Sequence, residues 1–165
     1  MTGLIIGNLC SLLAMVTDSV SSSRKTARGV LVVQCVSQFI YGMGAIALKG
    51  YSAAVQNVVS IFRNLFAIKG GKSKTIEWTL IALGVVLGIV FNNRGIFGIL
   101  PVLANLEYTV AVFKYKDDER ALKIAFMICT ILFMIFNAVV MNFVGMISNL
   151  IVIVSTIIFL IKEKK

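Results

Sequence analysis

Three ionisable side chains interrupt long apolar stretches of this sequence: Asp18, Arg63 and Glu107. A charge at the centre of a bilayer costs about 2.5–3.5 kcal/mol on insertion scales, so such residues commonly serve binding, proton transfer or ion pairing. At about 1.5 Å per helical residue, Glu107 would lie roughly 6 Å from the membrane midplane, with Arg63 at nearly the same depth. Asp18 would lie nearer one face.

Two chemical roles are open to these groups. Arg63 can form a structural ion pair with one of the two acids. Glu107 has the shortest side chain relative to its depth, so it needs a partner, a proton or water more than the others do. If it faces a cavity, it could bind a cationic group or carry a proton. We therefore expect one acid to be structural and one to be functional.

Uncharged polar side chains form a second layer of candidates. Gln34, Gln38 and Tyr41 are spaced i, i+4 and i+7, which places them on one face of a helix. Polar contacts between membrane helices average only about 0.6 kcal/mol, so any one of these residues could be simple packing glue. Together with Glu107, the residues that we expect to line a solute-binding cavity are Gln34, Gln38, Tyr41, Asn105, Tyr108, Asn137 and Asn149.

The elements that position these residues are predicted to be membrane helices. The chain has 165 residues, of which 59% are hydrophobic and 14% charged, against about 45–50% and 25% in soluble domains. Apolar runs long enough to cross a core of roughly 30 Å recur along it. They predict helices at 3–20, 27–48, 53–68, 75–92, 95–113, 121–141 and 144–161.

Basic residues divide unevenly between the connecting loops. The loops after the second and fourth helices hold only Lys49 and Arg94, and Arg63 lies inside a span. Because Lys and Arg concentrate in cytoplasmic loops, this pattern predicts an odd number of spans, with the N-terminus outside and the C-terminus in the cytoplasm. The other thirteen of the sixteen basic residues lie in alternate loops, their edges and the tail: Arg24, Lys25, Arg28, Lys69, Lys72, Lys74, Lys114, Lys116, Arg120, Lys123, Lys162, Lys164 and Lys165.

The seven helices also group into a repeat. A single transmembrane domain over 1–165 would contain a first triple-helix repeat at 3–69, a linker helix at 75–92 and a second repeat at 95–162. One odd helix between the triplets makes them parallel. Parallel repeats are a known transporter plan, with the site at the repeat interface.

Three features carry a resemblance to a known family: Ser60 to Leu65 in the third helix, Gly98 to Val102 opening the fifth, and the spacing of the charged loops. In these the chain resembles the YgjV family of bacterial inner-membrane proteins, which is related to the SWEET and PQ-loop group. The resemblance implies a multi-pass protein of the bacterial inner membrane with a SWEET-like 3+1+3 fold. The chain departs from the wider group because it lacks a Pro-Gln dipeptide and has Pro101 as its only proline. Sugar transporters of that group typically have paired prolines in both triplets, so these departures argue against a sugar substrate.

The resemblance also implies how the charges are arranged. In a SWEET-like bundle the third helix packs beside the first, which would pair Arg63 with Asp18 and leave Glu107 facing the central cavity. Pro101 would bend the fifth helix, either as a static kink or as a hinge. Gly84 and Gly88 would give the fourth helix a close-packing face or a contact in a homo-oligomer.

The sequence disfavours several function classes. It has no histidine and no CxxC motif, so no metal or cofactor site is expected. Walker A, GxSxG and GxGxxG motifs are also absent, so no enzyme is expected. The net charge of +9 comes from loops beside the membrane, not from a nucleic-acid patch. A facilitator of a polar neutral or cationic metabolite is expected, and the alternative is a receptor or accessory subunit that keeps the fold without transporting.

Overall fold

The computed structural model describes residues 1–115 and 117–162. Within them the chain forms seven α-helices and one 3-10 helix. With the 3-10 helix counted as the start of the fifth helix, each helix boundary lies within two residues of the sequence prediction, because turn residues and hydropathy mark the ends clearly. The helices are α1 (Thr2–Ser22), α2 (Ala27–Ala47), α3 (Tyr51–Ile68), α4 (Lys74–Val90), η1 (Gly95–Ile99), α5 (Leu100–Lys114), α6 (Glu119–Val139) and α7 (Phe143–Lys162).

Short polar side chains start three of the helices at the same end of the bundle. Thr26 accepts a hydrogen bond from the backbone N–H of Gly29 at the start of α2, and Ser73 does the same for Ile76 at the start of α4. At α6 the carboxylate of Asp118 caps a backbone N–H at 3.0 Å. Such caps satisfy donors that a helix start leaves open, so these loops are brief.

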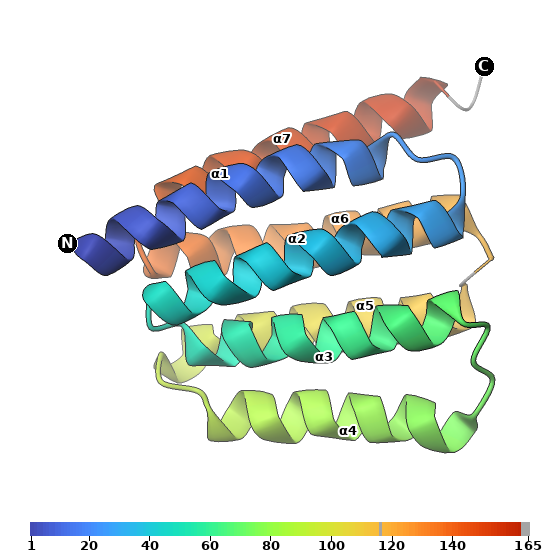
Figure 1. Ribbon diagram of the computed structural model, residues 1–165, viewed down its shortest axis with the longest axis horizontal. Helices are drawn as coiled ribbons and strands as arrows, with labels where there is room; N and C mark the ends of the chain where they lie inside the picture. The colour runs from blue at the N-terminus through green and yellow to red at the C-terminus, as the bar shows by residue number, and fades with distance from the viewer. Residues whose placement is uncertain (116, 163–165) are drawn as a thin grey trace.

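The helices stand in two layers. Figure 1 shows α1, α2 and α3 side by side, with α7, α6 and α5 behind them in the matching order and α4 along the edge beside α3. Helix α1 packs on α2 and α7, and α3 packs on α2, α4 and α5. Helices α2 and α6 face each other across the middle with far fewer contacts than the other neighbouring pairs have.

The expected neighbour of α1 was wrong. The third helix does not pack beside the first, because α2 lies between them. Glycines explain this order, since they allow α1 and α2 to approach closely. A Cβ on Gly3 would lie 2.5 Å from the carbonyl oxygen of Ala47, and one on Gly7 would lie 2.4 Å from Cγ of Leu48.

The outer surface fits a lipid bilayer. Large apolar side chains on every helix are exposed, including Phe39 at 62% and Val90 at 69%. Five segments are long and apolar enough to cross a membrane, namely α1, α2, η1 with α5, α6 and α7. Helix α4 has 17 residues, and α3 carries six buried polar side chains. That all seven helices cross the bilayer stays a prediction.

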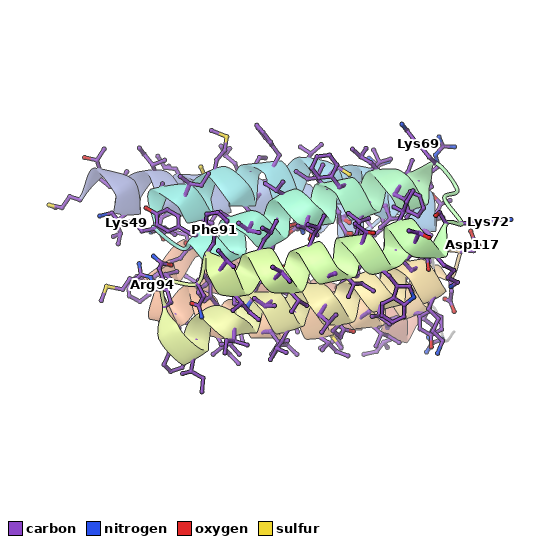
Figure 2. All side chains as sticks on the ribbon, turned by 90° about the horizontal axis from the view of Figure 1, so that it is seen from below. Lys49, Lys69, Lys72, Phe91, Arg94 and Asp117 are labelled. Carbon is purple, nitrogen blue, oxygen red and sulfur yellow. The ribbon has the colours of Figure 1, made fainter. Side chains whose placement is uncertain are left out.

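The charged loops separate in space as well as in sequence. Figure 2 shows Lys69, Lys72 and Asp117 at one end of the bundle, and Lys49 and Arg94 at the other. We call these the Lys72 end and the Arg94 end. Lys116, Lys164 and Lys165 lie outside the described residues. Which end faces the cytoplasm stays a prediction.

The two glycines of α4 face the protein. A Cβ on Gly84 would lie 3.4 Å from Nδ2 of Asn105, and one on Gly88 would lie 2.2 Å from Nε2 of Gln56. Gln56 is in α3 and Asn105 is in α5, so these glycines let α4 close on both helices. Of the two readings open at the sequence level, the close-packing face within one chain is the one the structure supports.

This packing predicts the effect of filling the α4 face. We expect Gly88→Leu to lower the free energy of unfolding by about 1–3 kcal/mol, because the new side chain overlaps Gln56 and Val102. Thermal unfolding of the purified protein in detergent measures the change. Val86→Leu places the same side chain at a position that is 56% exposed and serves as the control. Equal stability of the two variants would contradict the packing.

Candidate functional site

The polar side chains buried between the helices form two separate groups. The first, which we call the Arg63 cluster, lies where α3, α4 and α5 meet and reaches across to α2. The second surrounds a cavity in the middle of the bundle. The Arg63 cluster consists of Gln34, Gln56, Ser60, Arg63, Asn64, Asn105, Tyr108 and Thr109.

Arg63 is fully buried and is held by neutral groups. Its Nε donates to Oδ1 of Asn64 at 2.9 Å, and its Nη1 donates to Asn105 at 2.8 Å and to Thr109 at 3.1 Å. The guanidinium carbon lies 4.6 Å from the ring centroid of Tyr108, within the range of a cation–π interaction. Three side chains and one aromatic face therefore replace the carboxylate that a buried arginine usually pairs with.

Asn105 is the centre of this cluster. Its Oδ1 accepts hydrogen bonds from Ser60 at 2.6 Å and from Arg63, and its Nδ2 donates to Oε1 of Gln56 at 2.6 Å. Gln56 in turn donates to the backbone carbonyl of Gly84 at 2.7 Å. Two amides, Asn105 and Gln56, thus connect α3, α4 and α5 through consecutive bonds. Because both the oxygen and the nitrogen of its side-chain amide are bonded to α3, Asn105 contributes to helix packing in this structure.

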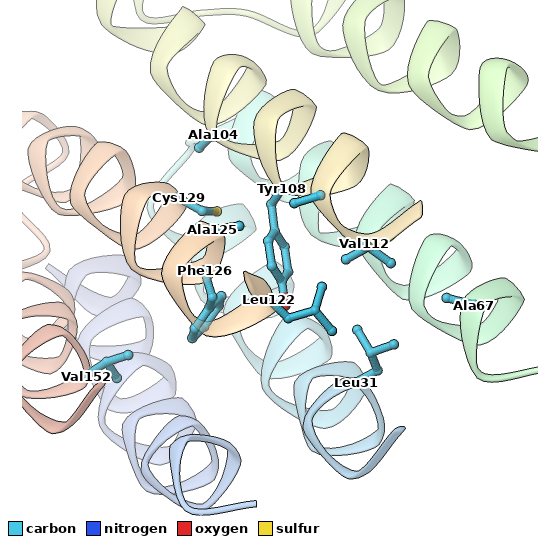
Figure 3. Close-up of a cluster of buried hydrophobic side chains, with 11 residues drawn as sticks. Leu31, Ala67, Ala104, Tyr108, Val112, Leu122, Ala125, Phe126, Cys129 and Val152 are labelled. Carbon is cyan, nitrogen blue, oxygen red and sulfur yellow. The ribbon is translucent and has the colours of Figure 1, made fainter. Parts of the chain in front are cut away.

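Tyr108 continues the cluster into an apolar layer. Its hydroxyl donates to Oε1 of Gln34 at 2.8 Å, and its ring packs 5.5 Å from that of Phe126. Figure 3 shows Tyr108 lying among Leu31 of α2 and Leu122 and Phe126 of α6. These residues belong to the largest buried apolar cluster, which packs the bundle toward the Lys72 end.

The cavity lies between α1, α2, α3, α6 and α7 and has a volume of about 60 Å³. At about 10–15 Å³ per water it has room for roughly four to six water molecules. Its main polar groups come from both layers: Asp18, Gln38, Tyr41 and Asn57 from the first, and Thr130, Asn137 and Asn149 from the second. It occupies the seam at which α2 and α6 make few contacts.

A family model described as a bacterial inner membrane protein, Imp-YgjV, matches residues 5–165. The chain belongs to the YgjV family of bacterial inner-membrane proteins. No curated protein and no solved structure matches it. The predicted resemblance to the YgjV family and the predicted location in the bacterial inner membrane are therefore confirmed, and the relationship to the SWEET and PQ-loop group stays a prediction.

The structure of this YgjV-family chain divides the eight predicted cavity residues. Four line the cavity: Gln38, Tyr41, Asn137 and Asn149. Three, Gln34, Asn105 and Tyr108, lie in the Arg63 cluster instead. Glu107 belongs to neither group. The role of the lining residues in binding a solute stays a prediction.

Neither of the two membrane acids lies where the sequence led us to expect it. Arg63 and Asp18 are not brought together, because Arg63 reaches toward α5 while α2 separates α3 from α1. Asp18 is buried on the cavity wall, which Tyr41 of α2 also lines. Glu107 does not line the cavity, since the rotation of α5 directs its neighbour Tyr108 inward and leaves Glu107 partly exposed.

Pro101 also differs from its predicted setting. It lies in the first turn of α5, directly after the 3-10 helix η1. Pro costs little there, because the first N–H groups of a helix have no partner within it. It therefore interrupts no α-helix, and its role as a hinge stays a prediction.

Several lining residues were missed by the sequence reading, among them Thr130 and Asn142. Asn142 donates to Oγ of Ser11 at 2.8 Å and to Asn137, which ties α7 to α1 beside the cavity. Its signal in the sequence was weak, since it falls in the short loop predicted between the helices at 121–141 and 144–161. Among the described residues, no group of three or more His, Cys, Asp or Glu lies together as a metal site.

The two groups predict different costs for the same substitution. We expect Asn105→Leu to lower the free energy of unfolding by about 2 kcal/mol, because it removes several interhelical contacts of about 0.6 kcal/mol each and leaves Arg63 with fewer acceptors. Asn149→Leu should cost less than half as much, because its Nδ2 has no bonded partner among the described residues. Thermal unfolding of the two purified variants tests this, and equal losses would contradict the division into two groups.

Proposed function

We propose that the chain is a small-solute transporter or facilitator of the bacterial inner membrane. The observation that supports this proposal is the polar cavity at the seam between the two helical layers. Lipid-facing helix bundles usually close over a tightly packed interior. A space lined by amides, hydroxyls and one acid has the groups needed to bind a polar solute. It lies between two groups of helices, where transporters built from repeats bind their solute.

The arrangement of helices supports a SWEET-like 3+1+3 repeat. A two-fold axis along the bundle, between α2 and α6, would exchange α1 with α5, α2 with α6 and α3 with α7. It would also exchange the α1–α7 contact with the α3–α5 contact, and both contacts are present. Helix α4 would be the linker that makes the repeats parallel. The order of helices within each layer differs from the SWEET-like order. The relationship we propose is therefore limited to the 3+1+3 arrangement of two parallel triplets and a linker helix.

The two ends of the cavity support alternating access. Toward the Arg94 end a thin layer of Leu48, Ala53, Phe136 and Val140 covers it. Toward the Lys72 end the larger apolar cluster around Tyr108 and Leu122 closes the bundle. Rocking of the first triplet (α1 to α3) against the second (α5 to α7) would open the apolar cover at one end of the cavity and tighten the apolar cover at the other end. The solute would then cross without a catalytic step or a bound cofactor.

The alternative function is a membrane interaction protein that keeps this fold without transporting. The Arg63 cluster favours it to a degree, because polar groups bonded to one another suffice for structure alone. The cavity is what the alternative leaves unexplained. Filling the cavity therefore discriminates between the two, and homo-oligomerisation is compatible with either.

Filling the cavity should stop solute movement. We expect the full chain in liposomes to speed the swelling caused by urea, glycerol or methylammonium chloride over that of empty vesicles, and Thr130→Phe to remove at least about nine-tenths of the added rate. Thr130 is 5% exposed and lines the cavity, so the ring would occupy it. Stopped-flow light scattering measures the rates.

The control for this experiment lies on the same helix. Ile131→Phe adds the same ring at a position that is 39% exposed and outside the cavity, and it should leave the rate unchanged. Equal rates for Thr130→Phe and the native chain would remove the cavity from the pathway. Rates no faster than those of empty vesicles for all three solutes would favour the alternative function.

We also propose that the Lys72 end faces the cytoplasm, as the basic loops predict. A membrane-impermeant maleimide should label Phe91→Cys in spheroplasts and should label Lys72→Cys only after permeabilisation. Both positions are exposed and lie at opposite ends of the bundle. The native chain is the control, because Cys10, Cys35 and Cys129 lie within α1, α2 and α6. The reverse labelling pattern would contradict the orientation.

A further inference from the structure

The charged lining of the cavity is acidic only. Among the residues that the structure describes, Asp18 is the one acid on its wall, and no lysine or arginine lines it. Arg63, the basic group deepest in the bundle, points its guanidinium into the contacts with Asn105 and Thr109. A cation entering the cavity would therefore meet a carboxylate with no positive lining side chain to repel it. An anion would be repelled by the carboxylate of Asp18, with no positive lining side chain to offset that repulsion.

Aromatic side chains share this wall. Tyr41, Phe126, Phe133 and Phe136 all line the same cavity as Asp18. Aromatic rings attract organic cations through their electron-rich faces, and several rings around one space are the usual cage for ammonium groups. A metal cation prefers several carboxylate or carbonyl oxygens and keeps its waters, which rings cannot replace. The combination of one acid and several rings is suited to an alkylated ammonium ion.

The polar groups complete the same chemistry. Tyr41 lines the same cavity as Asp18, and its hydroxyl oxygen and the amide oxygens of Gln38 and Asn57 can accept hydrogen bonds from an ammonium N–H. The volume of about 60 Å³ limits the ligand to a few heavy atoms. Methylammonium falls within that limit, and a disaccharide or a nucleoside does not.

We propose that the cavity binds a small organic ammonium ion, with the carboxylate of Asp18 as its counter-charge and the surrounding rings and amides as its cage. This inference rests on the proposed function and names the class of its solute. It assigns the binding role to Asp18, which the sequence reading placed in an ion pair. It gives Glu107 no part in binding.

The two membrane acids provide a matched test. Melting temperatures of the purified full chain in detergent are measured against increasing methylammonium chloride, with sodium chloride keeping the ionic strength constant. Methylammonium should raise the melting temperature, whereas methanol, which is similar in size and uncharged, should not. Asp18→Asn should raise the half-saturating concentration about tenfold or more, because a hydrogen bond to a charged group is lost. Glu107→Gln should change it less than about twofold.

A second variant covers the case in which Asp18→Asn fails to fold. Gln38→Glu adds a carboxylate to the same wall and should lower the half-saturating concentration several-fold. Methylammonium stabilisation that is unchanged in Asp18→Asn, or weakened equally in Glu107→Gln, would overturn the assignment. So would equal stabilisation by methanol. Urea or glycerol flux that is lost in Thr130→Phe, without any methylammonium binding, would overturn the ammonium inference and leave the transporter proposal standing.

Discussion

A guanidinium buried between helices that face lipid is the constraint on which the rest of this structure depends. Lipid offers no acceptor for the N–H groups of Arg63, so protein groups have to supply them. They come from α5, through Asn105 and Thr109, and from the face of Tyr108. This requirement holds α3 against α5 and fixes the rotation of α5 about its axis. Through Gln56 and the carbonyl of Gly84 it extends to α4.

The opposite edge of the bundle is joined by different chemistry. There Asn142 of the α6–α7 loop donates to Ser11 of α1, and the backbone N–H of Val144 donates to Oδ1 of Asn8 at 3.0 Å. Polar bonds therefore connect the two layers at both edges, α3 to α5 and α1 to α7. Between the edges, Tyr108 of α5 donates to Gln34 of α2, and Nζ of Lys123 of α6 donates to the carbonyl oxygen of Arg24 before α2. The cavity lies along the seam between α2 and α6, which no hydrogen bond among the described residues joins directly.

The helices could be predicted from the sequence and the neighbours could not. Apolar run length and turn residues determine where a helix begins and ends, so every boundary was close. The face of a helix is also predictable, and Gln34, Gln38 and Tyr41 do share one. Spacing does not reveal what that face meets along its length: Gln34 meets Tyr108, whereas Gln38 and Tyr41 meet the cavity. Glu107 and Tyr108 differ by one position, about 100° of rotation, and that rotation was decided by Arg63 on another helix.

The separation of Asp18 from Arg63 bears most directly on function. A buried acid and a buried base cost least when they are paired, and a bundle built for stability alone would gain by joining them. Here amides, a hydroxyl and one ring contact the base, and the acid lines the cavity. Helix α2 stands between the two, with Gln34 bonded to Tyr108 beside the base and Tyr41 on the cavity wall that Asp18 shares. The arrangement places a carboxylate on the wall of a polar cavity instead of in an ion pair with Arg63, and the proposed binding of a small solute depends on that placement.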